Sequence, residues 1–468
     1  MANKLYEESS VSAIADAIRR KNGQATTYTV AEMAPAIDAI STGYTITNGV
    51  KQQYMADSTT IPADTFVEFV RNATAHPTKI TDTQVVSSNP TFAAAVKLSD
   101  TTVFVAYTSS STLYGVVCTV SGSSITVGTS VVIPNGSSNT NIALIGANKV
   151  FVVYRHTGAN GLYGAVCTIS GTTVSVGTEA SITSRTNSHA DIATLEDDKV
   201  IIVEGNTSSP AGLYGIVCTV SGTTITAGTE TVIVSGSAYM HCKVLALDSS
   251  TVFVTNSASS VLNAIICTIS GTTITVGTNT TIDSREVAFT FNRPVLIGPN
   301  KVFLAFCPEI SSRNILNGIV CTVSGTTITA GTAATLPSST ISVFTNVSAV
   351  CLADDSVAVG FSGGSSHALY YSLCTVNGSN ITVNTTTNSA SYGNNSGDYI
   401  SLVSLDGNTV FTPHKLTQNS NNKFYVGIST MYDISLTVQA SVDKIDGVAA
   451  EQITTSAAGD VWVLNNNS

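Results

Sequence analysis

The chain has 468 residues, of which only 11% are charged, and its formal net charge is −10. Nucleic-acid binding needs a basic stripe, so this charge argues against a nucleic-acid partner. Since ordinary domains have about 25% charged residues, the polar surface must come from Ser, Thr and Asn, which suits a protein exposed outside cells better than a cytosolic enzyme.

The first forty residues predict a helical hairpin, here assigned to 1–43. Val11, Ile14 and Ile18 fall on one helical face, and Gly23 provides a stop. The spacing of Thr29-Val30-Ala31-Glu32 is that of a capping box for a second helix. Two such helices cannot form a stable domain alone. They are expected either to anchor the protein by docking or oligomerising, or to pack on their own chain.

Two stretches of this hairpin, Val11-Ser12-Ala13-Ile14-Ala15-Asp16-Ala17-Ile18-Arg19 and Ala31-Glu32-Met33-Ala34-Pro35-Ala36-Ile37, resemble a leader of tail appendage proteins from phages infecting Gram-positive bacteria. The resemblance implies that residues 1–43 dock to other virion proteins and that the protein is a homo-oligomer, with a trimer as one option. It also implies assembly in the bacterial cytoplasm and location in the virion tail. No apolar run near the N-terminus or elsewhere has the length of a signal h-region or a membrane span, so we expect neither secretion by a signal peptide nor a membrane partner.

Both ends of the chain next to the repeats have β character. Residues 44–78 form an expected β linker element, with alternating apolar residues at Ile46–Val50 and Thr65–Val70. Residues 443–468 form an expected C-terminal β element, with strands near Ile445–Val448 and Gly459–Leu464. We expect two small sandwich-like elements.

Residues 79–442 are a repeat array. A Leu-Tyr-Gly-x-Val-Cys-Thr stretch recurs every 49 to 55 residues, with a seventh copy in which Ser429 replaces Cys. Six of the nine cysteines hold the same position in six repeats: Cys118, Cys167, Cys218, Cys267, Cys321 and Cys374. A period of this size is typical of propeller blades, whereas solenoid coils are usually shorter. Equivalent cysteines lie a blade apart and cannot pair, so we expect buried free thiols. Cys242, Cys307 and Cys351 are also expected to be reduced.

Each repeat contains four strand signals, called A to D. In the second copy these are Ile142–Ile145, Lys149–Tyr154, Leu162–Ile169 and Thr173–Ile182. Strands C and D are joined by a tight turn whose glycine supplies a positive φ. The sequence therefore predicts an all-β chain with a seven-bladed β-propeller of four antiparallel strands per blade. Thr81–Val86 resembles the end of strand D and is expected to close the ring beside Ile434–Val442.

Almost all variation between repeats falls in the B–C and D–A loops, which emerge at one end of such a propeller. Diverse loops on a rigid scaffold are typical of binding faces. An alternative is that loops are simply where a charge-poor β protein places its charges. The candidate ligand-binding residues are Arg155, His156, His189, Glu204, Tyr239, His241, Arg285, Phe289, Phe291, Arg293, Arg313, His367 and His414.

Signals for catalysis or metal binding are weak. Histidines and cysteines do not share metal-ligand spacing, and the carboxylates that could serve a glycosidase fall on separate blades. We therefore expect a non-enzyme without metal or cofactor. The favoured function is that of a tail fibre or receptor-binding protein whose loop face binds a host surface glycan or protein. A purely structural virion protein and a glycan depolymerase are the alternatives.

Overall fold

The computed structural model describes residues 50–54, 66–72, 77–87, 90–185, 188–206, 209–236, 240–258, 261–310, 313–336, 343–353, 355–363, 368–388, 400–418, 421–438, 447–449 and 459–463. The chain divides into two compact units. One is Ala73–Asp433; the other combines Met1–Asn72 with Ile434–Ser468. The expected helical hairpin of residues 1–43 lies outside the described residues. Nowhere in the described ranges is there a helix suited to crossing a membrane.

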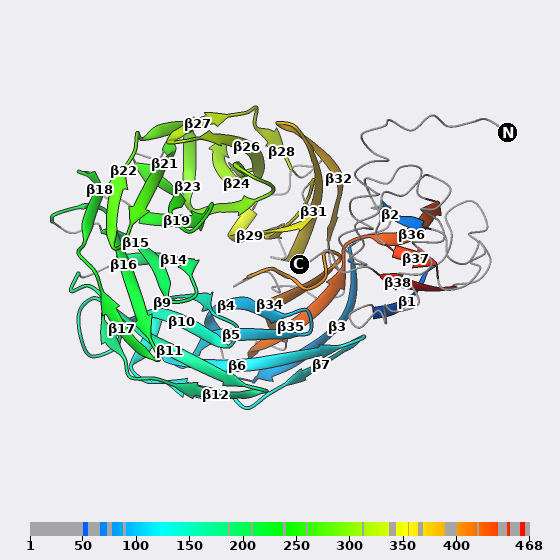
Figure 1. Ribbon diagram of the computed structural model, residues 1–468, viewed down its shortest axis with the longest axis horizontal. Coiled ribbons are helices and arrows are strands. Elements are labelled where there is room, and N and C mark those ends of the chain that lie inside the picture. Colours follow the sequence, from blue (N-terminus) through cyan, green and yellow to red (C-terminus); the bar gives the residue numbers. More distant parts are fainter. Residues whose placement is uncertain are drawn as a thin grey trace, which may run out of the picture. The chain divides into compact units, whose positions relative to one another are not determined.

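The larger unit is a seven-bladed β-propeller with four antiparallel strands per blade, as predicted (Figure 1). Blade 1 contains β4 (Pro90–Ser99), β5 (Thr102–Ser109), β6 (Thr112–Ser121), β7 (Ser124–Val127) and β8 (Val131–Ile133). Blade 2 contains β9 (Gly136–Ile145), β10 (Lys149–His156), β11 (Leu162–Ser170), β12 (Thr173–Val176) and β13 (Ala180–Ser181). Blade 3 contains β14 (Ser188–Glu196), β15 (Lys199–Asn206), β16 (Gly212–Ser221), β17 (Thr224–Ala227) and β18 (Thr231–Ser235).

The remaining blades follow the same order. Blade 4 contains β19 (Met240–Ala246), β20 (Thr251–Ala258), β21 (Val261–Ser270), β22 (Thr273–Val276) and the start of β23 (Thr280–Leu296). Blade 5 contains the end of β23 with β24 (Lys301–Ile310), β25 (Arg313–Asn314), β26 (Asn317–Ser324), β27 (Thr327–Ala330) and β28 (Ala334–Thr335). Blade 6 contains β29 (Val343–Ala353), β30 (Ser356–Gly363), β31 (Ala368–Asn377) and β32 (Asn380–Asn388). Blade 7 contains β33 (Val403–Ser404), β34 (Thr409–Gln418), β35 (Asn421–Thr430) and β3 (Thr78–Val86).

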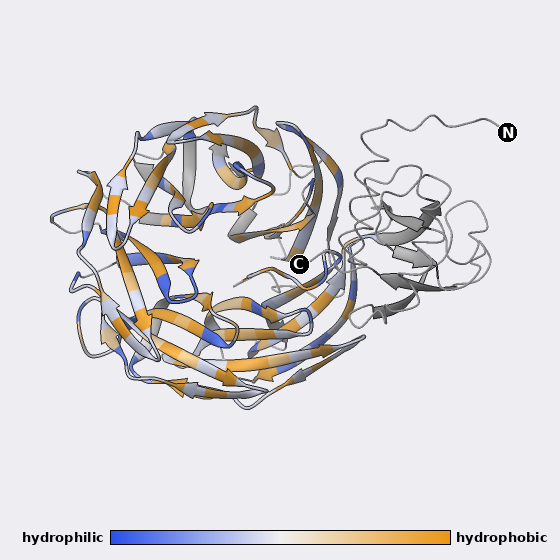
Figure 2. Ribbon diagram, in the orientation of Figure 1, coloured by the Kyte–Doolittle hydropathy of each residue, from blue (hydrophilic) through white to orange (hydrophobic). Residues whose placement is uncertain are grey.

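The hydrophobic core lies between the blades. Buried side chains of the described residues form seven clusters, and each cluster joins two consecutive blades of the ring. Strands B and C are apolar at consecutive positions because both of their faces meet a neighbouring blade; Val150–Tyr154, for example, is fully buried. Figure 2 shows hydrophobic residues along the strands of the ring. Burial of apolar area at these contacts is the main force that holds blade to blade.

The nine cysteines are free thiols, as predicted. Each repeat cysteine packs against the preceding blade; Cys167, for instance, belongs to the cluster that joins blades 1 and 2. Eight are buried and Cys351 is partly exposed. Burial raises the pKa of Cys167 to about 12, so this thiol stays protonated and behaves as a small apolar side chain.

Strand D is not the single strand that the sequence predicts. In blade 2 it is divided into β12 and β13, which pair with different parts of β11. Between them Gly177 donates its N–H to the Val166 carbonyl at 2.9 Å. A Cβ at this position would lie 2.7 Å from Thr223 Cβ of the next blade. The repeated glycine therefore interrupts strand D where the chain must approach both its own blade and its neighbour.

The other repeated glycine, at the C–D turn, behaves as predicted: Gly171 has a φ of 59°. The equivalent Gly122, Gly222, Gly271, Gly325 and Gly378 also have positive φ.

The ring is closed by β3, which supplies the outer strand of blade 7. Thr83 pairs with Val426 and Asp82 with Gly427 on β35. The expected closing role of Thr81–Val86 is therefore confirmed, but its expected partner is wrong. The segment after Ile434 leaves the blade, since β36 (Asp433–Val438) joins a different sheet. Strand β3, which precedes the first repeat in the chain, thus occupies the place in blade 7 that strand D holds in the other blades.

The smaller unit contains a five-stranded sheet in the order β1-β38-β37-β2-β36. Its strands are β1 (Val50–Tyr54), β2 (Phe66–Asn72), β36, β37 (Gly447–Ala449) and β38 (Gly459–Val463). Strands from before and after the repeats therefore share one sheet, with Gln52 paired to Val461.

Candidate functional site

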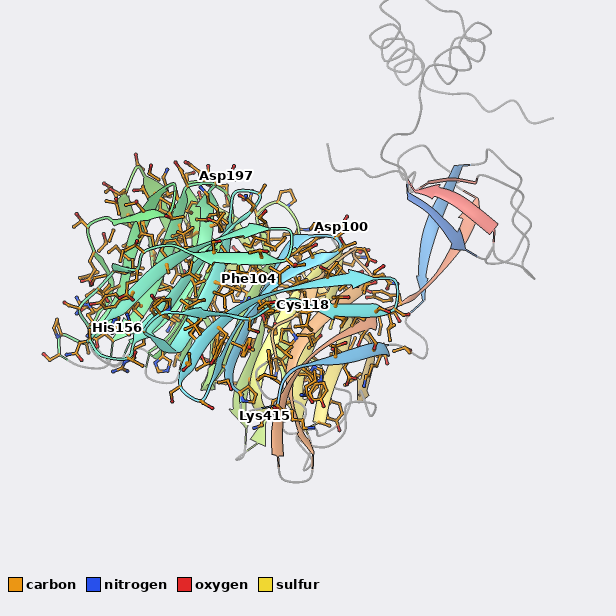
Figure 3. All side chains as sticks on the ribbon, turned by 90° about the horizontal axis from the view of Figure 1, so that it is seen from below. Asp100, Phe104, Cys118, His156, Asp197 and Lys415 are labelled. Carbon is orange, nitrogen blue, oxygen red and sulfur yellow. The ribbon has the colours of Figure 1, made fainter. Side chains whose placement is uncertain are left out.

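The two ends of the propeller carry different connections. Asp100 and Asp197, on A–B turns, lie at one end, and His156 and Lys415, on the B–C side, lie at the other (Figure 3). We call these the turn face and the loop face. On the turn face, side chains close the turns themselves: Asp406 Oδ1 accepts the N–H of Asn408 at 2.9 Å. The loop face is the end that the sequence predicts to bind a ligand.

On the loop face, blade 2 carries a cluster built around Glu179. Tyr154 OH donates to Glu179 Oε2 at 3.1 Å, and Asn135 Nδ2 donates to Oε1 at 2.9 Å. His156 Nδ1 accepts the N–H of Gly158 at 2.9 Å, so in the neutral imidazole the proton is on Nε2, 3.5 Å from Glu179 Oε1. The His156 ring lies 4.5 Å from the Tyr163 ring. A carboxylate with fixed orientation therefore lies beside two partly exposed rings.

Blade 3 repeats this arrangement with different side chains. Glu230, the counterpart of Glu179, accepts from Arg185 Nε at 3.0 Å and also contacts Arg185 Nη2. The Arg185 guanidinium lies 3.5 Å over the Tyr214 ring. Arg185 belongs to the loop that leaves blade 2, so its ion pair and its ring contact join two blades.

Arg285 occupies the position in blade 4 that Arg185 occupies in blade 2. It forms a fork with Asp283, with Nη2 2.6 Å from Oδ2 and Nε 2.9 Å from Oδ1. Its guanidinium lies 5.9 Å from the Phe306 ring of blade 5. Here the carboxylate comes from the same strand, β23, so the contact between blades is with the ring alone.

Two predicted ligand-binding residues are buried inside blades. Glu204 on β15 is 2% exposed, and its Oε2 accepts from Thr183 Oγ1 at 2.8 Å. His414 on β34 is fully buried, its Nδ1 lies 3.0 Å from the Thr412 carbonyl, and burial lowers its pKa to about 4. The sequence places both next to loops, but the strands continue through them, so neither side chain is open to a ligand.

Two other predicted residues line a cavity on the axis of the propeller. His189 and Arg293 lie on inner strands β14 and β23, and both contribute to a cavity of about 530 Å³. Burial is the main cause that lowers the pKa of His189, and the positive charges of Lys243 and Arg155 lower it further. The structure thus brings His189 together with Arg293 at the centre of the ring, whereas His156 lies in the separate cluster of blade 2.

The other predicted residues are described in part or not at all. Tyr239 and His367 lie outside the described residues. His241 lies on β19, Phe289 and Phe291 on β23, and Arg313 on β25, with only the backbone of these positions described.

The cavity is also lined by one inner residue of each blade. In six blades this residue faces the fifth residue of strand B, as Asp191 faces Val203 and Lys243 faces Thr255. In blade 7 the lining residue lies two residues before β33. We call this set the axial ring. Its members are Ala94, Asn141, Asp191, Lys243, Arg293, Ser348 and Ser401.

Of these positions, sequence reasoning predicted Arg293 as a ligand-binding residue and considered Asp191 only as a carboxylate for glycoside hydrolysis; Glu179, Glu230 and Lys243 were missed. Glu179 and Glu230 could have been found because a carboxylate follows the same Gly-Thr pair in consecutive repeats. Asp191 and Lys243 could have been found by aligning the inner strands, since polar residues recur there in otherwise apolar segments. Within the described ranges, His, Cys, Asp and Glu side chains form no group of three or more that could hold a metal ion.

Comparison with known proteins adds similarity of fold only. No protein-family model and no curated protein matches the sequence. Among solved structures, the chain is similar to the BP39L lectin from Burkholderia pseudomallei, with 11% identity, 79% of this chain and 100% of that chain covered, and a TM-score of 0.49. It is also similar to a protein from Lactobacillus plantarum, with 11% identity, coverage of 75% and 95%, and a TM-score of 0.49. The NanB sialidase from Streptococcus pneumoniae has 11% identity, coverage of 75% and 70%, and a TM-score of 0.42. At these values the comparisons assign neither a family nor a ligand.

Proposed function

We propose that this protein is a phage tail fibre or receptor-binding protein whose loop face binds a host surface glycan. The tail assignment depends on the sequence resemblance of residues 11–37. The glycan assignment depends on the loop face and above all on one observation in blade 2: a carboxylate held in place by hydrogen bonds, that of Glu179, lies beside the partly exposed rings of His156 and Tyr163. In blade 3 the matching carboxylate, that of Glu230, pairs with Arg185, which covers the buried Tyr214 ring.

This arrangement suits sugars for two reasons. Sugar hydroxyls donate well to a carboxylate whose orientation is already fixed, because little entropy remains to be lost on binding. The C–H face of a sugar ring packs on an aromatic ring such as Tyr163. Glu179 and Glu230 are partly exposed, so each has capacity for a further donor.

In the virion, residues 1–43 would dock to other tail proteins, and an oligomer, with a trimer as one option, would present several loop faces to the cell surface. Several weak sites acting together raise the overall avidity without any new contact. Neither a nucleic acid nor a membrane is a partner in this proposal.

The proposal is tested by the binding of the full-length protein to host cells and to an array of their surface glycans. We expect the double variant His156→Ala/Glu179→Gln to bind at least about tenfold more weakly, because it loses a charge-assisted acceptor and a ring. The control Lys199→Gln changes a residue on the turn face, paired there with Glu196, and should bind like the parent.

The other outcomes separate the alternatives. A folded protein that binds no host glycan or cell would refute the proposal and favour a purely structural virion protein. Release of reducing sugar from host polysaccharide by the parent, lost on changing a loop-face carboxylate, would identify a depolymerase instead.

A further inference from the structure

Ala94 has no polar side chain, and the other six members of the axial ring are of two kinds. Four of them fasten the inner strands to one another. Asn141 Nδ2 donates to the Ala190 carbonyl at 2.6 Å, and Asp191 Oδ2 accepts the Val244 N–H at 2.9 Å. Ser348 Oγ accepts the Leu402 N–H at 2.9 Å, and Ser401 Oγ accepts the Ala95 N–H at 3.1 Å. In each case the residue reaches the backbone of the next blade, so these four positions have a structural use.

Blades 4 and 5 have cations at this position, Lys243 and Arg293. Neither makes a hydrogen bond of this kind to the backbone of the next blade within the residues that the structure describes. Lys243 Nζ lies 3.6 Å from Asp191 Oδ1, an ion pair rather than a direct hydrogen bond. Arg293 is half-buried, and its guanidinium has no hydrogen-bond or ion-pair partner among the residues that the structure describes. Since a guanidinium carries five N–H donors, a partly buried one without a partner is poised for an anionic acceptor.

The rest of the cavity wall favours a polar ligand with one apolar side. His189 lies two residues before Asp191 on β14, so the two side chains share a face, and Phe92 holds the same position on β4. Burial, Lys243 and Arg155 lower the pKa of His189, which leaves a neutral imidazole at neutral pH. With two cations and a single carboxylate, the wall is net positive in a chain whose formal net charge is −10. Such a contrast concentrates anions at the cavity.

We propose that the central cavity binds the acidic sugar of a glycan, with Lys243 and Arg293 on its carboxylate. This inference rests on the proposed function and adds the chemical class of its ligand. The volume of about 530 Å³ lies within the usual range for small-molecule sites. Sugar hydroxyls find acceptors and donors in Asp191 and His189, and the Phe92 ring supplies an apolar surface.

The test uses a matched pair of probes, glucuronate and glucose, which differ in the carboxylate. Titration calorimetry of the full-length protein should detect glucuronate, with glucose bound at least about tenfold more weakly, because only glucuronate pairs with the two cations. Inorganic sulfate is the third probe. Glucose binding equal to that of glucuronate, or no binding of either, would overturn the inference, as would sulfate binding as tight as glucuronate.

Variants of the two cations test whether glucuronate binds at the axial ring. Lys243→Gln/Arg293→Gln should abolish glucuronate binding, and each single change should weaken it about tenfold. Lys301→Gln removes the same charge from blade 5 at the turn-face end of β24, and should have no effect. Retained binding in the double variant would overturn the inference. If the double variant fails to fold, the probe selectivity of the parent still decides.

The same experiments separate this inference from the proposed function. If the parent binds host glycans but not glucuronate, the loop-face proposal stands and the cavity assignment fails. If glucuronate binds in the cavity but no host glycan or cell is bound, the proposed function fails while the cavity site remains.

Discussion

The blade framework and the loop face follow different rules, although both are repeated around the same ring. We use the term blade framework for the buried strands of the blades and the repeated glycines that join or interrupt them. In the framework, one residue type recurs because one geometry recurs: a Cβ at Gly277 would lie 2.5 Å from the Ile266 carbonyl oxygen, and at Gly228 it would lie 2.7 Å from that of Val217. On the loop face, the position of Glu179 is held by Ser130, Glu230 and Asn279 in other blades. In three blades its partner comes from the same position of strand B: Tyr107 donates to Ser130, Tyr154 to Glu179 and Asn256 to Asn279. In blade 3 the partner of Glu230 is instead Arg185, from the loop that leaves blade 2. Framework positions are constrained by backbone, whereas loop-face positions are constrained by a partner side chain whose type differs between blades.

The largest effect should come from adding a methyl group to a framework glycine. Gly277→Ala places a Cβ against the backbone of its own blade, which cannot move without shifting strand C. We expect the free energy of unfolding to fall by about 3 kcal/mol. Denaturant unfolding followed by fluorescence measures it.

Gly158→Ala is the matched control on the loop face. The nearest atom to its Cβ would be His156 Cε1 at 3.6 Å, an ordinary contact. Its effect should stay within about 0.5 kcal/mol. Equal losses for the two variants would contradict the distinction between framework and loop face.

A smaller effect on stability should come from His414. The sequence places this residue next to a loop, but in the structure it is buried on β34. Its folded-state pKa of about 4 lies below the ordinary value of 6.5 because burial disfavours the charged form, and Thr412, Asp82 and Lys79 are the other groups that act on it. The unfolded chain therefore binds the proton more readily, so stability is lost as the pH falls from about 6.5 to about 4. The loss from this group is at most about 3 kcal/mol.

His414→Gln should remove that contribution. The decrease in unfolding free energy between pH 7 and pH 4 should be smaller in the variant than in the parent, which shares every other titrating group. Identical pH dependence in the two proteins would show that His414 does not titrate in this window.

The smallest effect should come from the blade-to-blade contact of Arg185 on the loop face. The ion pair with Glu230 is partly exposed, with 18% and 30% of the two side chains accessible, so solvent weakens it. In a double-mutant cycle with Arg185→Met and Glu230→Gln, we expect a coupling energy of about 1 kcal/mol. Thermal unfolding of the four proteins measures it, and a coupling near zero would mean that the pair contributes nothing to the joining of blades 2 and 3.

Repetition made the fold predictable. The period, the glycine turn and the doubly apolar strand C identified seven four-stranded blades, and the equivalence of the cysteines excluded disulfides between them. Periodicity could not show the break in strand D, because Gly177 is required by the approach of Thr223 from the next blade, 46 residues away. Nor could it find the partner of Thr81–Val86, since pairing across the whole array depends on how the ring closes.

The candidate site was predictable to a smaller extent. Sequence variation between repeats identified the loop face and singled out His156, His189 and Arg293. It did not separate His189 and Arg293 from His156, because residues of different blades meet on the axis only when the ring is closed. By itself, the sequence determined the architecture, since each blade follows from local strand and turn patterns that are repeated. Only the tertiary structure decided which polar residues share a space, because their contacts cross from one blade to the next and leave no periodic signal in the chain.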